Sequence, residues 1–481
     1  MAGNTLRPIS LVPLGDDVPS DMLNHPAVAG NINLLGAWIE SRMAYSGVPG
    51  LSIAVVADQQ ILWQCGFGHA NVERNEAAAP DTIYRIASIT KLFTATAIMQ
   101  LRDGGKLQLD DPLLHHLPWF NIRERFPDEP PITLRHLLTH TAGLPREPAF
   151  PHWVTSQFPT LSQIREKLGE QETVLARDAK LKYSNLALAL AGEVVAAVSG
   201  VPYADYVRTQ ILKPLRMDST FVAPVPVDHP RLATGYGRRL PDGTRALSPY
   251  TDGQGLTPAF NMATTVSDLA QFAMLQFRVD GKQENGVLAP RTLREMHRVH
   301  YLGNDWQQAW GIGFSVWRDE GHTYVGHGGA VLGSRTRIAL RPADKIGVIV
   351  FTNADDGLPE AYVMRAFRWL APAIAAARAH PDKADKADPA WQAYVGKYRN
   401  VWRDTEVLVR NGELLAIDPT LDDPLQLCAR LRPEGDHTFR REEKHYGGRH
   451  GELLRFEMGA DGRAVRMVEA SGAHSERVLS W

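Results

Sequence analysis

The sequence has little cysteine and no long apolar run. Cys65 and Cys428 are the only cysteines in 481 residues, which argues against a disulfide framework and a cysteine-rich metal site. No apolar stretch approaches the roughly 20 residues that a membrane-spanning helix requires. Residues 1–20 lack a cationic start followed by an apolar core, so we expect no secretory signal and a cytoplasmic location.

A strong charge of either sign is also absent. The formal net charge is −2, with 52 Lys and Arg against 54 Asp and Glu. We therefore expect neither a nucleic acid nor a membrane among the partners. Hydrophobic residues make up 44% and charged residues 22% of the chain, as in ordinary globular proteins, and the length predicts two or three domains.

Hydrophobic periodicity predicts one α/β domain over residues 31–380, after an N-terminal extension at 1–30. A helix is expected at the start of this domain, followed by strands, a helical middle, further strands and a last helix. This order indicates one sheet split by an all-helical subdomain. The expected helices are 31–45, 133–140, 185–198, 203–211, 265–277 with Ser267 as its cap, and 360–378; the expected strands include 51–57, 61–64, 335–340 and 346–352.

The last quarter of the chain has a different texture. Residues 381–389 have the composition of a linker, with three Asp and two Lys. Residues 390–481 then show short alternating segments separated by turns, and Asn411-Gly412 is a strong hairpin signal. We predict a separate antiparallel β-domain there, in the form of a small barrel.

The stretch Ser88-Ile89-Thr90-Lys91 places a hydroxyl and an amine on one face of an apolar helix. A serine hydroxyl becomes a good nucleophile only when a neighbouring base takes its proton. A lysine can be that base if burial or a nearby cation lowers its pKa from about 10.4. The plainer interpretation is a polar helix cap followed by a solvated lysine.

Tyr183-Ser184-Asn185 precedes another helix and offers partners for Ser88. A tyrosine near a protonated lysine can have its pKa lowered from about 10 and act as a general base, or serve as an acid toward the leaving group. Asn185 can donate to Lys91 or to a substrate carbonyl. The commoner use of such a tripeptide is a helix-capping serine beside a packed tyrosine.

Gly326-His327-Gly328-Gly329 follows a predicted strand. Glycines let a substrate approach backbone N–H groups, and a strand edge beside a nucleophile can supply an oxyanion-hole donor. The alternative is a glycine-rich turn with an incidental surface histidine.

These three motifs together resemble the class C β-lactamase-like serine hydrolases in order and approximate spacing. That superfamily includes penicillin-binding proteins, D-aminopeptidases and family VIII carboxylesterases. Residues 136–145 (HLLTHTAGLP) and 310–314 (WGIGF) are similar to signatures of its peptidase and esterase branch. The resemblance covers roughly residues 30–375 and implies a β-lactamase/transpeptidase-like antiparallel sheet flanked by helices. The tail is similar, more loosely, to the lipocalin-like β-domains of some relatives.

The resemblance implies roles for individual residues. Ser88 would attack the acyl carbonyl, while Lys91 and Tyr183 would share the proton transfers. The backbone N–H groups of Ser88 and Ala330 would form the oxyanion hole, and Asn185 would orient Lys91 and the acyl group.

The third motif departs from the pattern of true β-lactamases. His327 stands where they have a lysine, and Gly328 stands where they commonly have a hydroxyl that helps hold the substrate carboxylate, followed by Gly329. Without a fixed cation, such a pocket is expected to hold anionic β-lactams poorly, while neutral esters lose nothing. Arg335 or Arg337 could restore the cation.

The sequence thus predicts a serine hydrolase acting on small carboxylic esters. The alternatives are a D-aminopeptidase- or D,D-peptidase-like amide hydrolase with weak β-lactamase activity, and a non-catalytic scaffold that binds a cell-wall peptide. No cofactor or metal is expected, because His115-His116 lacks a third ligand at a suitable spacing. The aromatic residues Trp119, Phe150 and Trp153 could line an acyl pocket, although core packing is the commoner role. The sequence leaves a homo-oligomer open.

Overall fold

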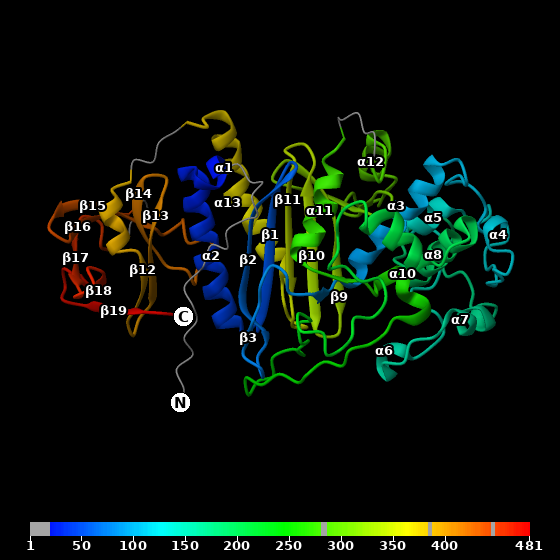
Figure 1. Ribbon diagram of the computed structural model, residues 1–481, viewed down its shortest axis with the longest axis horizontal. Coiled ribbons are helices and arrows are strands. Elements are labelled where there is room, and N and C mark those ends of the chain that lie inside the picture. Colours follow the sequence, from blue (N-terminus) through cyan, green and yellow to red (C-terminus); the bar gives the residue numbers. More distant parts are fainter. Residues whose placement is uncertain (1–19, 280–285, 383–386, 444–447) are drawn as a thin grey trace. The chain divides into compact units, whose positions relative to one another are not determined.

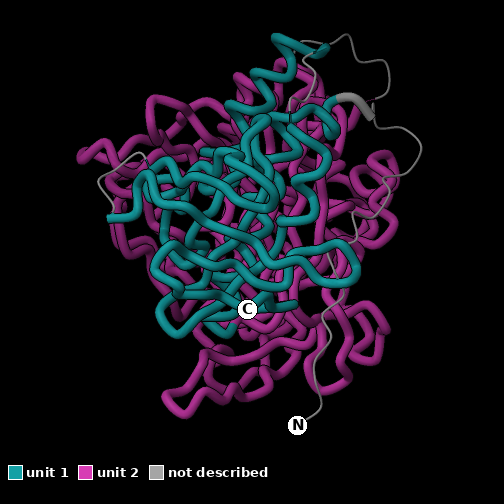
Figure 2. Tube along the Cα trace, turned by 90° about the vertical axis from the view of Figure 1, so that its left-hand side faces the viewer, with its two compact units in different colours: residues 1–47, 364–481 teal, residues 48–363 magenta. Residues whose placement is uncertain are grey.

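A computed structural model describes residues 20–279, 286–382, 387–443 and 448–481. The chain divides into two compact units, coloured separately in Figure 2: residues 48–363, and residues 1–47 with 364–481. Much of the expected N-terminal extension, including the segment considered for a secretory signal, and the middle of the expected linker at 381–389 lie outside the described residues.

One antiparallel sheet dominates the unit of residues 48–363 (Figure 1). Its central strands β1 and β11 are buried along their whole length, which explains why their sequences are continuous apolar runs rather than alternating ones. The order across the sheet is β3 (Glu76–Ala77), β2 (Gln60–Asn71), β1 (Gly50–Ala57), β11 (Ile346–Thr352), β10 (Ser334–Arg341), β9 (His322–Val331), β8 (Ser315–Asp319), β7 (Ala309–Trp310) and β6 (Tyr301–Leu302). β4 (Tyr84–Arg85) pairs separately with β5 (Ala263–Thr264).

Helices of the same unit form the expected helical middle. α11 packs against β1 and β11, while α3, α5 and α10 pack around α8. Apolar side chains of these helices form one large core with residues of the sheet. The helices are α3 (Thr90–Asp103), α4 (Leu113–His116), α5 (Leu134–Thr139), α6 (His152–Thr155), α7 (Leu161–Leu168), α8 (Asn185–Ser199), α9 (Tyr203–Val207), α10 (Thr257–Phe260), α11 (Val266–Gln276) and α12 (Pro290–His297).

Two details of these helices concern predictions from the sequence. The expected cap Ser267 is wrong: Thr265 is the N-cap of α11 and accepts from the Asp268 N–H at 3.0 Å. The Ser267 hydroxyl instead donates to Gln64 Oε1 at 2.7 Å. Within the described residues no single helix has the length and hydropathy to cross a membrane; residues 185–199 and 203–212 pass that test only as a pair bent by 78°.

The other unit contains a closed barrel of antiparallel strands, as the sequence predicts. Asn411 and Gly412 both have positive φ, at 54° and 77°, which fits the expected two-residue hairpin between β13 and β14. Apolar side chains fill the barrel. Its strands are β12 (Gly396–Arg399), β13 (Asp404–Arg410), β14 (Glu413–Ile417), β15 (Ala429–Gly435), β16 (Thr438–Glu443), β17 (Leu453–Met458), β18 (Ala464–Glu469) and β19 (His474–Val478).

Among the described residues, three α-helices belong wholly or partly to this unit. α1 (Ser20–Asn24) leads into α2 (Pro26–Ser46), which packs against β13. Arg410 Nε of that strand donates to Asn31 Oδ1 at 3.0 Å. Gly30 is required at this contact, because a side-chain carbon there would lie 2.7 Å from the Arg410 Cα. Most of α13 (Pro359–Ala379) also belongs to this unit.

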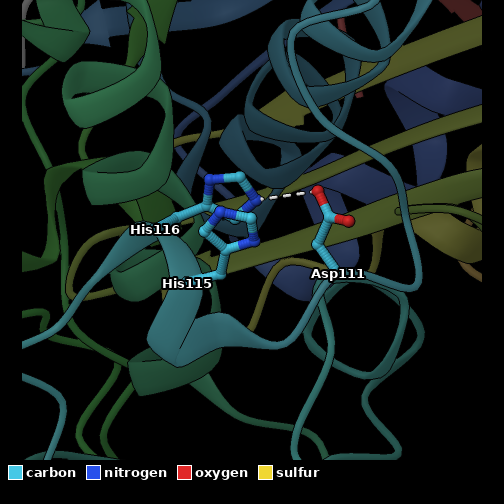
Figure 3. A group of neighbouring side chains, drawn as sticks. All are labelled: Asp111, His115 and His116. Carbon is cyan, nitrogen blue, oxygen red and sulfur yellow. Dashed lines mark hydrogen bonds and ion pairs between the residues drawn. The ribbon is translucent and has the colours of Figure 1, made fainter.

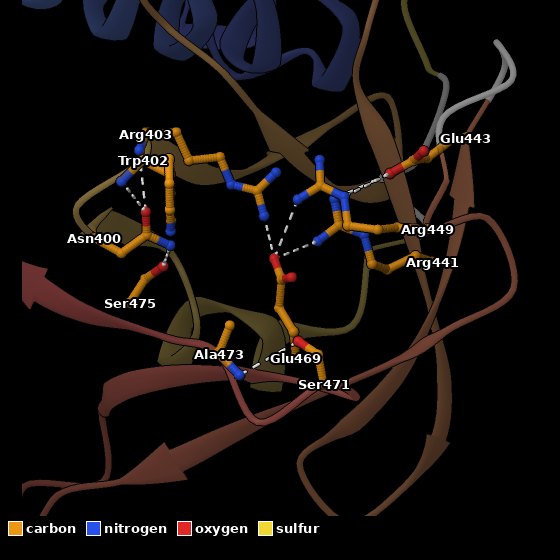
Figure 4. Close-up of polar contacts among 10 residues, drawn as sticks. All are labelled: Asn400, Trp402, Arg403, Arg441, Glu443, Arg449, Glu469, Ser471, Ala473 and Ser475. Carbon is orange, nitrogen blue, oxygen red and sulfur yellow. Dashed lines mark hydrogen bonds and ion pairs between the residues drawn. The ribbon is translucent and has the colours of Figure 1, made fainter.

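An ionic cluster connects charged side chains of this unit (Figure 4). Glu469 Oε1 contacts Arg403, lies 3.2 Å from Arg449 Nη1 and 3.5 Å from Arg441 Nη1. Arg441 also pairs with Glu443 at 3.1 Å. The charges in this cluster therefore have oppositely charged neighbours within ion-pair distance, which is what largely buried charges require.

Candidate active site

Ser88 lies in a 3₁₀ turn (Ala87–Ile89) directly before α3. The turn begins with Ala87 at φ +47°, a left-handed conformation that costs a non-glycine residue on the order of 1–2 kcal/mol. Ala87 is fully buried, so packing around it holds the strained backbone in place. This backbone conformation places Ser88 directly before the first turn of α3.

Strand β9 passes very close to the residue before this turn. A side-chain carbon on Gly329 would lie 2.2 Å from the Ile86 carbonyl oxygen and 2.1 Å from Thr336 Oγ1. The Thr336 hydroxyl donates to the same Ile86 carbonyl at 3.1 Å. Only glycine fits at position 329, so this motif brings β9 against the Ser88 turn.

Lys91 is completely buried, one helical turn after Ser88. Its Nζ lies 3.1 Å from Ser88 Oγ, 2.8 Å from Asn185 Oδ1 and 2.7 Å from the Ala259 carbonyl oxygen. Burial holds the pKa of Lys91 well below its ordinary value; the nearby Glu147 carboxylate opposes this shift and the Arg146 guanidinium adds to it. The solvated lysine of the plainer interpretation is therefore wrong.

Tyr183 faces the same serine, since the Ser88 hydroxyl is close enough to its phenol to act on the phenol's pKa. The Lys91 Nζ lies 4.8 Å from the centroid of its ring. The expected lowering of the Tyr183 pKa is wrong: burial raises this pKa above its ordinary value, and the nearby Ser88 hydroxyl offsets the rise only in part. The phenol is therefore protonated at neutral pH.

Asn185 connects Lys91 to a partly buried carboxylate. Its Nδ2 donates to Glu147 Oε1 at 2.6 Å, so its Oδ1 faces Lys91 as an acceptor. Glu147 Oε2 lies 3.2 Å from Nε2 of the fully buried His152. The helix-cap interpretation also holds here, because the Ser184 hydroxyl accepts from the Ala187 N–H at 2.9 Å.

Sequence reasoning missed Glu147, Ala259 and His140. His140 lies inside the 136–145 signature and Glu147 lies two residues beyond it. Their closeness to this signature was the one feature of the sequence that could have indicated a place in the site. The His140 ring packs on the Tyr183 ring at 4.3 Å between centroids, and its Nδ1 accepts from the Ser184 N–H at 3.2 Å. Burial and the charge of Lys91 lower the pKa of His140. A backbone acceptor such as Ala259 carries no signal in the sequence.

His327 is buried on β9 beside Tyr183, with ring centroids 6.1 Å apart, so the surface-histidine alternative is wrong. Burial lowers the pKa of His327 to about 3, and Lys91 and Arg337 add to this. Its Nδ1 lies 2.6 Å from the Gly328 carbonyl. The proton of the neutral ring must sit on Nδ1, which leaves Nε2 as an acceptor without a partner among the described residues.

The sequence left open whether a cation lies near Gly328, and the structure places one there. Arg337 pairs with Gly328 across the strands, and its Nη1 lies 3.4 Å from where a side-chain carbon of that glycine would stand. The guanidinium stacks on Trp317 at 4.3 Å and its Nε lies 2.5 Å from Glu360 Oε2. Arg335 is instead held by Asp355 and by backbone carbonyls.

Ala330 follows Gly329 on β9 and is exposed. Its oxyanion-hole role, with the Ser88 N–H, stays a prediction. Of the aromatic candidates for an acyl pocket, Trp153 packs next to the site. Its ring centroid lies 5.3 Å from that of Phe260, the residue that follows Ala259. Trp119 is covered by Arg165 at 4.4 Å.

A third potential ligand does lie beside His115 and His116, contrary to the sequence-based expectation (Figure 3). The ligand atoms of Asp111 and the two histidines all lie within 4.8 Å of one another. The two rings are stacked with 10° between their planes. His116 Nε2 lies 3.0 Å from Asp111 Oδ2, so two of the three potential ligands already share a hydrogen bond.

Comparison with known proteins gives a family and several relatives. The β-lactamase family model matches residues 35–373. Protein flp from Staphylococcus aureus (strain NCTC 8325 / PS 47) is 28% identical over 315 residues, which are 66% of this chain and 61% of that protein. β-lactamase-like protein 2 from Dictyostelium discoideum is 29% identical over 357 residues, or 73% of this chain and 64% of that protein. The chain thus spans less than two thirds of these relatives.

Solved structures share the fold. The octameric penicillin-binding protein homologue from Pyrococcus abyssi aligns with a TM-score of 0.63 at 24% identity, covering 92% of this chain and 99% of that one. EstCE1, a hydrolase with promiscuous acyltransferase activity, aligns with 0.60 at 22% identity, covering 71% and 98%. The class C β-lactamase from Rhodobacter sphaeroides aligns with 0.59 at 22% identity, covering 71% and 99%.

These likenesses confirm the predicted fold class, which consists of a β-lactamase/transpeptidase-like sheet flanked by helices and, in addition, a closed C-terminal barrel. They also agree with the sequence resemblance that rested on the Ser88, Tyr183 and His327 motifs. Since the family model extends over well more than half of the residues, the chain belongs to the β-lactamase family, within the β-lactamase-like serine hydrolase superfamily.

Proposed function

We propose that this protein forms an acyl-enzyme through Ser88 and acts as a carboxylesterase on small esters. The observation that carries the proposal is the set of oxygens around the buried amine of Lys91. Two of them, Asn185 Oδ1 and the Ala259 carbonyl, can only accept hydrogen bonds. The third, Ser88 Oγ, can also donate.

A neutral amine has two N–H groups and one lone pair. With its N–H groups donated to Asn185 Oδ1 and the Ala259 carbonyl, the lone pair of Lys91 faces Ser88. The lowered pKa makes the neutral form accessible. Lys91 is then placed to take the Ser88 proton as the oxygen attacks the acyl carbon. A scaffold protein would gain nothing from this arrangement, since a buried lysine without a carboxylate partner destabilises the fold.

The protonated phenol of Tyr183 suits the second half of acylation. The phenol lies near Ser88 and is therefore close to the departing alkoxide, to which it can donate its proton as the bond between the acyl carbon and the leaving oxygen breaks. The proton that Lys91 took from Ser88 then restores the phenol. Water reverses these steps in deacylation, so that ester and water give acid and alcohol with no net change in the protein.

The test is hydrolysis of p-nitrophenyl butyrate by the purified protein and by Ser88→Ala. We expect measurable turnover that the substitution abolishes, and labelling of the wild type alone by a fluorophosphonate probe. Circular dichroism of Ser88→Ala serves as the folding control. Unchanged turnover in this variant would reject the mechanism.

Amide hydrolysis is the second candidate, since the first chemical steps are the same and the fold also occurs in a D-stereospecific amidohydrolase from Streptomyces. Comparing kcat/KM for short esters, D-alanyl amides and nitrocefin separates the two. A cytoplasmic location remains a proposal from the sequence. A homo-oligomer is proposed as well, because the homologue from Pyrococcus abyssi is octameric; size-exclusion chromatography with light scattering tests it.

A further inference from the structure

We propose that Arg146 is a specificity residue that recruits substrates carrying a carboxylate. The inference rests on the proposed hydrolase function and names the substrate class of that site. It starts from an exposed cation that the acylation chemistry does not use.

The guanidinium of Arg146 lies over the catalytic phenol. Its Cζ is 5.1 Å from the centroid of the Tyr183 ring, and the phenol of that ring lies near Ser88. The charge of Arg146 also acts on Lys91 and His140, lowering the pKa of each. A cation that interacts electrostatically with three groups around the nucleophile is close enough to interact with a bound substrate as well.

The backbone of Arg146 is firmly anchored although its side chain is 60% exposed. Its carbonyl accepts from the Asn185 N–H at 2.8 Å. The residue before it, Pro145, accepts from the Ser184 hydroxyl at 2.6 Å, and the residue after it, Glu147, accepts from Asn185 Nδ2 at 2.6 Å. The guanidinium is therefore presented from a backbone fixed to the catalytic tripeptide.

Intramolecular pairing leaves most of the guanidinium available. Arg146 Nε lies 3.6 Å from Glu147 Oε1, but that oxygen already accepts from Asn185 and the other oxygen of the carboxylate is bonded to His152. Within the described residues neither Nη of Arg146 takes part in a hydrogen bond. These nitrogens are the fork that binds a carboxylate through two parallel bonds.

The experiment compares matched ester pairs that differ in one carboxylate. On the acyl side the pair is the p-nitrophenyl half-ester of adipic acid and p-nitrophenyl hexanoate; on the leaving-group side it is 4-acetoxybenzoate and its methyl ester. The measured quantity is the ratio of kcat/KM, anionic to neutral, for wild type, Arg146→Gln, Arg146→Lys and Arg208→Gln. Arg208 is the matched control, because it is 69% exposed and pairs with Asp205.

In one of the two pairs, we expect Arg146→Gln to lower this ratio about tenfold, the usual scale of a charge-assisted hydrogen bond. Arg146→Lys should retain part of the preference and Arg208→Gln all of it. Added salt should lower the ratio in wild type and leave it constant in Arg146→Gln. A loss of folding would lower both rates together and leave the ratio unchanged.

The inference is overturned if Arg146→Gln keeps the wild-type ratio within twofold for both pairs while the esters are hydrolysed. That result leaves the proposed function intact. Absence of hydrolysis of all four esters by the wild type overturns the proposed function itself, and the inference with it.

Discussion

Each unit of the molecule holds a largely buried lysine, and the two are arranged in opposite ways. Lys91, in the unit of residues 48–363, is surrounded by a hydroxyl, an amide oxygen and a backbone carbonyl. Lys397, in the unit that contains the barrel, lies 2.6 Å from Glu40 and 3.9 Å from Glu406. Burial lowers the pKa of Lys91, whereas the two carboxylates outweigh burial and raise the pKa of Lys397.

The difference shows what makes a buried lysine a base. Burial disfavours the charged amine at both sites, but a carboxylate in contact restores the charge and uses the amine as a structural ion pair. At Lys91 the carboxylate of Glu147 is held one residue away, behind the amide of Asn185. The amine therefore has hydrogen-bond acceptors without a counter-ion, and its lone pair is accessible.

Exchanging each lysine for methionine gives the largest expected effect. Lys91→Met should lower kcat/KM for p-nitrophenyl butyrate about 10³-fold, the scale of a lost general base. Lys397→Met should keep the rate within about twofold but lower the melting temperature, because unpairing two largely buried carboxylates costs on the order of 3 kcal/mol. Steady-state kinetics and thermal melts of both variants check this. Equal losses of activity in the two variants would contradict the different roles assigned to the two lysines.

Asn185→Asp should make the Lys91 site resemble that of Lys397. The added negative charge favours the protonated amine, so the acid limb of the kcat/KM profile should move to higher pH, and the rate at pH 7 should fall roughly 10- to 100-fold. Asn185→Ala is the control, since it removes the acceptor without adding charge. An acid limb that stays in place in Asn185→Asp would contradict the assignment of that limb to Lys91.

Glu406→Gln tests the barrel side of the comparison through stability. Burial raises the pKa of Glu406 to about 7, and Lys397 offsets this only in part. The folded protein holds this proton up to about pH 7, whereas the unfolded chain releases it near pH 4.5, so stability falls as pH rises between these values. The variant should be about 3 kcal/mol more stable at pH 8 and unchanged at pH 4, measured by urea unfolding. Equal stabilisation at both pH values would refute the titration.

Glu147→Gln is expected to have the smallest effect. Removing this charge, which raises the Lys91 pKa, should move the acid limb slightly to lower pH and change the rate at pH 7 about twofold. Arg146→Gln should move the limb in the opposite direction, because that guanidinium lowers the same pKa. Shifts of the same sign in both variants would argue against an electrostatic origin.

Much of the site could be predicted because its residues are local in the sequence. Ser88 and Lys91 lie one helical turn apart, and Tyr183-Ser184-Asn185 is recognisable as a tripeptide before a helix. The alternation of β13 and β14 with the Asn411-Gly412 turn similarly indicated the barrel. These features follow from short-range periodicity and turn chemistry.

The remaining features depend on contacts that short-range patterns do not encode. The direction of the Tyr183 pKa was wrong because burial of the ring by distant segments outweighs any cation. Ala259 contributes a backbone oxygen, and Asp111 reaches His116 only because the chain turns between them. Thr265 and Ser267 are both residue types that cap helices, and Thr265 is the one that caps α11. The Ser267 hydroxyl instead donates to Gln64 on strand β2, a distant partner that the local sequence does not indicate.

The join between residues 145–147 and the tripeptide at 183–185 has an evolutionary consequence. Its hydrogen bonds use the backbone of Pro145 and Arg146 and the side chain of Glu147, so the identity of the side chain at 146 is free to vary. If Arg146 is the specificity residue that we propose, mutation at this single position changes which molecules are accepted without removing a hydrogen bond that holds the catalytic residues together. Descendants of one ancestral hydrolase could diversify in this way without passing through an inactive intermediate.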